Sequence, residues 1–221
     1  MKYKCLVLDH DDTVVNSSQS IHYPAFLHTL TILRPHLEPL TFEDFNHHCF
    51  VYGFNHLCKE RYGFNDEEME IEYKTWKSHT QSKQADPFLG WKEILLRFKH
   101  DGGKIVVVSY SESSEIRRDY IDHFGFEPDL IFAYDHDKDK LKPHPYPIYQ
   151  ILDQFQLSKN EILVIDDMPV GYEMAQNANV DFIWAQWAYY DSRLNKLILL
   201  SSSPSLLNVI ELYKILEIDS L

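Results

Sequence analysis

Glycine is scarce in this sequence, with 7 residues among 221, and the few glycines form neither GxGxxG nor GxxxxGK[ST]. The sequence therefore lacks the phosphate-cradling fingerprints of dinucleotide-binding folds and P-loop enzymes. Cysteine is also rare, and Cys5, Cys49 and Cys58 include no CxxC pair, which argues against a zinc ribbon or a redox pair. Their odd number fits free thiols in a reducing cytosol.

Long apolar runs and basic residues are lacking as well. No run approaches the length of a transmembrane helix, and the N-terminal residues contain no signal-peptide h-region, so we expect a cytoplasmic protein. Lys and Arg number 21 against 34 Asp and Glu, which gives a net charge of -13. This balance argues against a nucleic-acid or membrane partner but does not exclude an anionic small molecule, because a bound cation can reverse the sign locally.

The apolar residues that are present form short, continuous runs. Their β-branched and aromatic content is typical of strands buried on both faces, as in a parallel sheet. The runs lie at residues 5–8, 104–109, 130–134, 162–165 and 180–185. Helical patterns follow at 89–100, 113–126, 145–157, 170–180 and 203–216. This alternation predicts an α/β fold with a Rossmann-like, doubly wound parallel sheet.

Residues 16–87 have a different pattern. They contain no buried-strand run, and helical patterns cover 21–33, 41–54, 54–64 and 66–83. We therefore predict an all-helical cap domain at 16–87, inserted after the first strand. The catalytic core is expected to comprise residues 1–15 and 88–221.

Polar residues follow the predicted strands at the points where the strands end. Asp9 and Asp11 follow the first run, Ser109 ends the second, and Asp166 and Asp167 follow the run at 162–165. Ligands of open parallel sheets bind at this edge, where Lys142 is also expected from its place at a helix start. The repulsion between four carboxylates in one cleft can be offset by a hard divalent cation with oxygen ligands, and we predict Mg²⁺.

Four short motifs carry a family resemblance. They are "DHDDT" at 9–13, Ser109 after "IVVV", Lys142 in "KPHP", and "VIDDMPVG" at 164–171. In order and spacing they resemble the motifs of the haloacid dehalogenase-like hydrolase superfamily. The helical interval after the first motif resembles the cap of its phosphoglycolate phosphatase and β-phosphoglucomutase branch.

The resemblance implies roles for individual residues. Asp9 would be the nucleophile that forms an aspartyl-phosphate, Asp11 the general acid and base, and Lys142 a stabiliser of developing charge. The second aspartate, Asp11, favours phosphoryl transfer over carbon–halogen cleavage, because only an alcohol leaving group needs a proton.

Binding roles follow from the same resemblance. The metal would be held by Asp9, the main-chain carbonyl of Asp11, and the Asp166–Asp167 pair, without a decision on which of the two touches it. The substrate and phosphate would contact residues from the motifs and from the cap, namely Ser109 with the neighbouring Tyr110, Thr13, which would also hold Asp9, and His22. The family often has glycine where Asp12 stands, so Asp12 would either distort the turn or face solvent from a helical turn.

The predicted function is hydrolysis of a small phosphorylated metabolite by a Mg²⁺-dependent phosphatase. A sugar phosphomutase of the same family is one alternative, and a phospho-accepting signalling or binding module without hydrolase activity is another. The histidines at 47, 48 and 56 complete no zinc spacing and are expected to be solvated or packed. Substrate identity and oligomeric state stay open.

Overall fold

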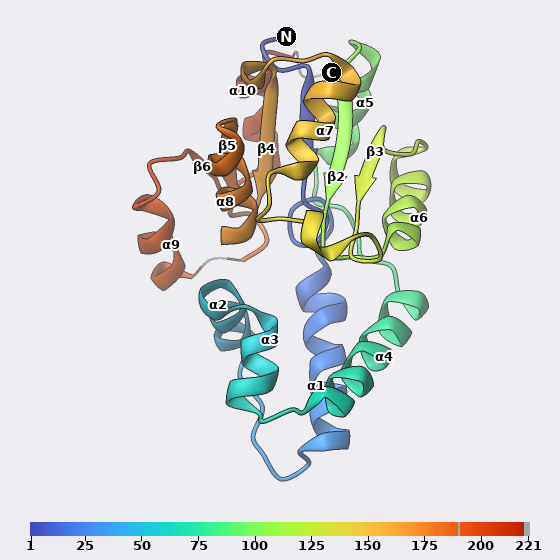
Figure 1. The fold of residues 1–221 in the computed structure, drawn as a ribbon, viewed down its shortest axis with the longest axis vertical. Coiled ribbons are helices and arrows are strands. Elements are labelled where there is room, and N and C mark those ends of the chain that lie inside the picture. The colour runs from blue at the N-terminus through green and yellow to red at the C-terminus, as the bar shows by residue number, and fades with distance from the viewer. Residues whose placement is uncertain (190, 219–221) are drawn as a thin grey trace.

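The protein is built around a parallel sheet (Figure 1). The computed structural model describes residues 1–189 and 191–218. Within these residues the sheet has 6 strands in the order β3-β2-β1-β4-β5-β6. The strands are β1 (Cys5–Leu8), β2 (Lys104–Val108), β3 (Leu130–Phe132), β4 (Ile162–Asp166), β5 (Asp181–Ala185) and β6 (Ser205–Leu206). The predicted α/β fold with a doubly wound parallel sheet is confirmed.

Both faces of the sheet are covered because alternate side chains of each strand point to opposite sides. Leu6 and Leu8 of β1 join one buried apolar cluster, whereas Cys5 and Val7 join another. The first cluster contains side chains of α5 (Trp91–His100), α6 (Ser113–Phe124) and α10 (Leu212–Leu216). The second contains side chains of α7 (Tyr146–Phe155), α8 (Pro169–Ala178) and α9 (Ser192–Leu199). The continuous apolar runs are thus explained by burial on two faces.

A separate group of helices lies beyond the carboxyl edge of the sheet (Figure 1). We call α1 to α4 the cap helices: α1 (Tyr23–Leu33), α2 (Phe42–Tyr52), α3 (Phe54–His56) and α4 (Asp66–Ser82). A π-helical turn, η1 (Ser18–His22), leads into α1, and a second, η2 (Leu57–Arg61), follows α3. The cap helices have their own aromatic core around Phe26 and Phe45. The start of α4 is fixed by a capping box in which Asn65 and Glu68 bond each other's backbone amides.

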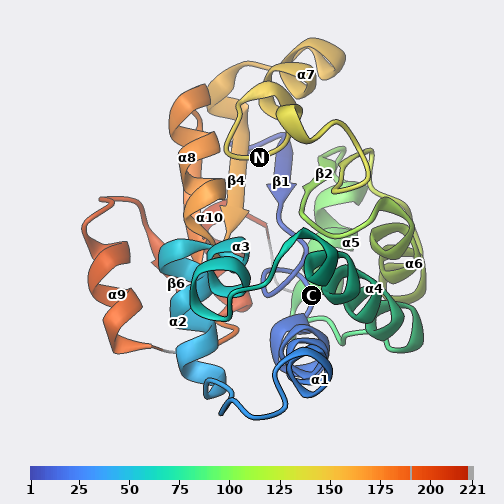
Figure 2. The ribbon, with the colours of Figure 1, turned by 60° about the horizontal axis from the view of Figure 1, so that its bottom comes forward.

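Polar and aromatic contacts join the cap helices to the core on two sides. On one side, Lys77 Nζ lies 2.8 Å from a carboxylate oxygen of Glu112 at the start of α6. On the other, Arg193 Nη1 of α9 lies 2.9 Å from Asp44 of α2, and Phe50 of α2 packs beside Trp184. Figure 2 shows α4 beside α6 and α2 beside α9. The cap helices therefore cover the carboxyl edge of the sheet.

The C-terminal part of the fold differs from the sequence prediction. The stretch 203–216, expected to be one helix, contains β6, the short turn η5 (Val209–Glu211) and only then α10. Trp184 N donates to Pro204 O at 2.9 Å, which places this stretch at the edge of the sheet. Proline tolerates such an edge because it has no N–H to donate. The helix α9 was not predicted.

Two further short helical turns, η3 (Lys138–Lys140) and η4 (Lys159–Glu161), complete the elements of the described chain. None of the helices formed by residues 1–189 and 191–218 has the length and apolar character needed to cross a membrane.

Candidate functional site

Three neighbouring strands bring the predicted site residues to one edge. Residues 5–8 of β1 pair in register with 104–107 of β2 and with 162–165 of β4. Asp9 and Asp166 consequently lie at the same level at the carboxyl ends of β1 and β4, and Ser109 directly follows the end of β2. The sequence-based expectation that these distant residues meet at the carboxyl edge agrees with this register.

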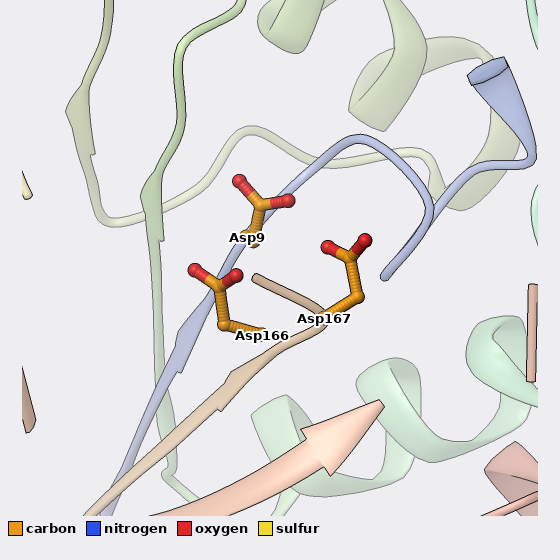
Figure 3. Close-up of side chains that lie close together, drawn as sticks. All are labelled: Asp9, Asp166 and Asp167. Atoms are coloured by element: carbon orange, nitrogen blue, oxygen red, sulfur yellow. The ribbon is translucent and has the colours of Figure 1, made fainter. Parts of the chain in front are cut away.

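A cluster of buried carboxylates lies at this edge. Asp9, Asp166 and Asp167 each offer an oxygen such that all three atoms lie within 4.8 Å of one another (Figure 3). The side chain of Asp11 lies outside this acidic cluster. Within the described parts of the chain, this is the only group of three potential ligand side chains close enough to hold one ion.

Lys142 supplies a positive charge to the acidic cluster. Its Nζ lies 2.7 Å from Asp9 Oδ1 and 2.7 Å from Asp166 Oδ2, and the side chain is buried. Burial alone would lower the pKa of Lys142, but Asp166 and Asp9 raise it, so the ammonium stays charged.

The charge balance of the acidic cluster fits a divalent cation. Three carboxylates face one ammonium, which leaves a surplus of two negative charges when all are ionised. Burial raises the pKa of Asp166 to about 7, and burial together with Asp9 raises the pKa of Asp167. Oxygen ligands of this kind suit Mg²⁺, whose charge would favour the ionised forms of these carboxylates.

Thr13 contacts the acidic cluster through a hydrogen bond to Asp167. Its Oγ1 donates to Asp167 Oδ1 at 3.3 Å, and its carbonyl oxygen accepts from the indole nitrogens of Trp91 and Trp187. Thr13 was expected to hold Asp9, whereas its hydroxyl bonds to Asp167. Thr13 is fully buried, so its side chain orients a candidate metal ligand.

The turn after β4 fixes Asp166. Met168 N donates to Asp166 Oδ1 at 2.8 Å, just before α8 begins at Pro169. Gly171 faces the same carboxylate so closely that a Cβ atom there would lie 2.1 Å from Asp166 Oδ2. A side chain at this position would force the carboxylate or the helix to move.

We therefore expect Gly171→Ala to weaken Mg²⁺ binding by roughly a factor of 10 or more, because Asp166 is displaced from its place beside Lys142. Isothermal titration calorimetry measures the affinity, and urea unfolding shows whether the variant folds. Val170→Ala, a change on the neighbouring residue of α8, is the control. Wild-type affinity in Gly171→Ala would contradict the expected displacement.

The side chain of Asp11 is held by two groups. Its Oδ1 lies 3.0 Å from His22 Nε2, and its Oδ2 accepts from Ser111 Oγ at 2.5 Å. Trp76 Nε1 donates to His22 Nδ1 at 2.9 Å, and an indole can only donate, so the proton of the neutral ring is on Nε2 and points at Asp11. Burial opposes ionisation of Asp11, but His22 and Ser111 outweigh it and hold its pKa well below the usual range.

Two residues of this arrangement were missed by the sequence analysis. Ser111 could have been found, because it follows Ser109 by two residues, and side chains two apart share a side in an extended segment. Trp76 had no local signal, since only the packing of α4 against η1 brings its indole to His22.

Tyr110 and Ser109 take different positions in the same loop. Tyr110 is 45% exposed, and its hydroxyl donates to the carbonyl oxygen of Lys142 at 2.5 Å. Ser109 is buried, and its Oγ accepts from Ser111 N at 3.3 Å. Tyr110 therefore contacts the backbone that carries Lys142, while Ser109 shapes the loop beside Asp11.

The side chain of Asp12 is buried in the turn after Asp11. The expectation that it faces solvent is wrong, because Asp12 is 4% exposed and accepts a hydrogen bond from Ser18 N at 2.9 Å. Its φ of 56° lies in the left-handed region that glycine would adopt without strain and that aspartate tolerates. Asp12 thus takes the backbone conformation of glycine and ties the turn to the start of η1.

The histidines at 47, 48 and 56 remain peripheral to the acidic cluster. His48 Nε2 and His56 Nδ1 are 3.0 Å apart in an exposed pair, and His47 lies near Asp191. The expectation that they are solvated or packed agrees with these positions.

Glu72 on α4 is a buried carboxylate one turn before Trp76. Burial raises its pKa from 4.5 to about 7. The folded protein therefore binds this proton more tightly than the unfolded chain, so the stabilisation is present below pH 4.5 and is lost as the pH rises through 7.

Glu72→Gln should consequently raise the free energy of unfolding at pH 8 by about 2 kcal/mol and change it little at pH 4.5. Urea unfolding at the two pH values measures the difference. Glu67→Gln on the exposed side of α4 is the control. An equal effect of Glu72→Gln at both pH values would contradict the raised pKa.

Comparison with known proteins is consistent with this geometry. Residues 6–185 match the sequence profile described as haloacid dehalogenase-like hydrolase. No curated protein has a sequence that matches this chain.

Solved structures share the fold at low sequence identity. A conserved haloacid dehalogenase-like protein of unknown function from Agrobacterium tumefaciens is 17% identical, with a TM-score of 0.78 over 97% of this chain and 98% of that chain. A predicted phosphoglycolate phosphatase from Haemophilus somnus is 16% identical, with a TM-score of 0.68 over 83% and 85%. CbbY from Rhodobacter sphaeroides, in complex with xylulose-(1,5)bisphosphate, is 15% identical, with a TM-score of 0.61 over 82% and 85%.

Proposed function

The chain belongs to the haloacid dehalogenase-like hydrolase family, and we propose that within it the chain is a Mg²⁺-dependent phosphatase that works through an aspartyl-phosphate. The observation that carries this proposal is the placement of Asp9. Asp9 lies in the acidic cluster, and its Oδ1 is 2.7 Å from Lys142 Nζ. Asp11 follows two residues later in the chain, and its carboxylate contacts His22 of η1. The proposed nucleophile, charge stabiliser and acid–base group would therefore act together at one edge of the sheet.

In the first step, a carboxylate oxygen of Asp9 attacks phosphorus, and the bond from phosphorus to the leaving oxygen breaks. Lys142 orients Asp9 and offsets the charge that develops on the transferred group. Asp11 gives its proton to the leaving oxygen. A bound phosphate dianion raises the pKa of Asp11, because a neighbouring like charge disfavours ionisation.

In the second step, water attacks phosphorus, and the bond from phosphorus to Asp9 breaks. Asp11 takes a proton from this water, for which it must be ionised. The contacts of its two carboxylate oxygens with His22 and Ser111 support this ionised form. The Trp76–His22 hydrogen bond fixes the ring that positions Asp11, and His22 is a proposed contact for the substrate as well.

The remaining predicted residues take supporting parts. Mg²⁺, held by Asp9, Asp166, Asp167 and the main-chain carbonyl of Asp11, would neutralise charge on the phosphoryl group. Ser109 would bind phosphate oxygens. Tyr110 would support phosphate binding by holding the backbone of Lys142. Thr13 would do so by orienting Asp167.

The substrate is proposed to be a small phosphorylated metabolite. Support comes from the cap helices, which cover the site on two sides and restrict its access. Two structural neighbours point the same way, one described as a predicted phosphoglycolate phosphatase and one in complex with a sugar bisphosphate. The net charge of -13 supports neither a nucleic-acid nor a membrane partner. We further propose a cytoplasmic enzyme in which residues 16–87 act as a cap domain.

Phosphate release from p-nitrophenyl phosphate tests the proposal. We expect turnover with Mg²⁺, loss of turnover after treatment with EDTA, and recovery when Mg²⁺ is restored. Unchanged release in EDTA, or none with Mg²⁺, would overturn it. A panel of phosphorylated sugars, nucleotides and short acids then identifies the substrate, and transfer of phosphoryl to a second hydroxyl of a sugar would favour the phosphomutase instead.

A further inference from the structure

A small cavity, lined mostly by polar residues, lies where η1 and the end of α4 meet the core. It offers about 20 Å³ to the centre of a water-sized sphere. One such sphere needs about 10–15 Å³ on this measure, so the cavity has room for one water molecule but not for a substrate. Its lining comes from the segment that carries Asp11, from the two connections between the core and the cap helices, and from α6. Its polar lining includes His10, Asp11, Ser17, Thr80, Glu115 and Asp119.

Three of the lining residues have a buried polar atom without a hydrogen-bond partner among the described residues. These atoms are His10 Nδ1, Ser17 Oγ and Glu115 Oε2. The three residues are only 2%, 2% and 6% exposed. A buried polar atom without a partner costs about 1–3 kcal/mol, so three residues that line one cavity and each carry such an atom point to a shared ligand.

The other polar atoms of these side chains are already anchored. His10 Nε2 lies 3.1 Å from Asp119 Oδ2, and Glu115 Oε1 accepts from Thr80 Oγ1 at 2.6 Å. The pKa of Asp119 is lowered despite its burial, with His10 as the main favourable partner, so its carboxylate accepts and His10 Nε2 donates. His10 Nδ1 has no such anchor, and it accepts a hydrogen bond when the ring is neutral and donates one when the ring is protonated.

The three free atoms match the bonding capacity of one water molecule. With a neutral His10, water can donate to His10 Nδ1 and to Glu115 Oε2 and accept from the hydroxyl of Ser17. With a protonated His10, water can accept from Nδ1 and donate to Glu115 Oε2 and to Ser17 Oγ. Three hydrogen bonds are the usual number for a buried water. The number stays the same if Glu115 carries a proton, because the Ser17 hydroxyl can accept instead of donate.

We propose that this cavity is a hydration site for one ordered water molecule, and that Glu115, through this water, is a positioning residue for the segment that carries Asp11. The water would join three segments: His10 stands between Asp9 and Asp11, Ser17 directly precedes η1, and Glu115 is bonded to Thr80 near the end of α4. The water would thereby link the start of η1 and the end of α4 to the segment that carries Asp11. The positioning role rests on the proposed phosphatase function, whereas the hydration site does not.

A high-resolution crystal structure of the full chain with Mg²⁺ tests the site directly. We expect one density peak within hydrogen-bond distance of His10 Nδ1, Ser17 Oγ and Glu115 Oε2. An empty cavity, or the three atoms bonded to one another, would overturn the hydration site whatever the activity of the protein.

Kinetics with p-nitrophenyl phosphate tests the positioning role. Glu115→Leu should lower kcat about tenfold with little change in KM, and Glu115→Gln, which can still bond the water, should stay within about threefold of wild type. Glu112→Leu is the matched control, because Glu112 also holds α4, through Tyr73 and Lys77, but does not line the cavity. This control should raise KM and keep the water.

Ser17→Ala is a milder variant in case Glu115→Leu does not fold, and kcat should fall about threefold when this donor is lost. Equal kinetic effects of Glu115→Leu and Glu112→Leu would overturn the positioning role, as would wild-type kcat in both Glu115→Leu and Ser17→Ala. An ordered water in a protein without phosphatase activity would refute the proposed function and the positioning role but leave the hydration site standing.

Discussion

Replacing Asp9 by asparagine is expected to lower phosphate release by roughly a factor of 1,000 or more, because a neutral amide does not attack phosphorus. The variant keeps the size of the side chain. Steady-state hydrolysis of p-nitrophenyl phosphate with saturating Mg²⁺ measures the effect.

The same substitution should not destabilise the fold. Asp9 raises the pKa of Asp167 in the acidic cluster, so loss of its charge relieves repulsion between buried carboxylates. We expect an unchanged or higher urea midpoint in EDTA. Asp181→Asn is the control, because Asp181 starts β5 at the opposite edge of the sheet and pairs with Lys2. More than a tenth of wild-type activity in Asp9→Asn would contradict the nucleophile assignment.

Replacing Lys142 by methionine should have the second-largest effect, both on activity and on stability. The ammonium touches Asp9 and Asp166, and all three side chains are buried. Removing one partner from a buried ion pair leaves uncompensated charge and costs about 3–5 kcal/mol. Turnover should fall roughly 1,000-fold, since Lys142 also offsets charge in the transition state.

Magnesium should rescue the stability of Lys142→Met but not its activity, because the cation can replace the lost positive charge but not the hydrogen bond that orients Asp9. Urea unfolding with EDTA and with Mg²⁺ measures this difference, which should be larger than in wild type. Lys140→Met is the matched control, since Lys140 is half-exposed and pairs with Asp137. Equal stability of Lys142→Met and wild type in EDTA would contradict the account.

The core of the fold was predictable because strands buried on both faces have continuous apolar sequences. Residues such as Val106 and Val164 stand in continuous apolar runs, and the polar residues that end those runs had to meet at one edge. The edge strand β6 was not predictable in this way. It is two residues long, and its pairing depends on Pro204 and Leu206 meeting β5, which no local pattern encodes.

The acidic part of the site was predictable for a chemical reason, and its surroundings were not. Asp9, Asp11, Asp166 and Asp167 follow predicted strands whose carboxyl ends meet at one edge, so a shared cleft was expected, and the repulsion between these carboxylates indicated a cation. The Trp76–His22–Asp11 chain joins three segments whose contact is set by tertiary packing. The cavity lined by His10, Ser17 and Glu115 likewise depends on tertiary packing, because these residues come from separate segments.

The central claim is that Asp9 carries the phosphoryl group during turnover. Acid quench during steady-state hydrolysis, followed by peptide mass spectrometry, tests it most directly. We predict one added phosphoryl group on the peptide that contains Asp9, present with Mg²⁺ and absent from Asp9→Asn. Turnover with an unmodified Asp9 peptide, or a phosphoryl group on another residue, would contradict the account.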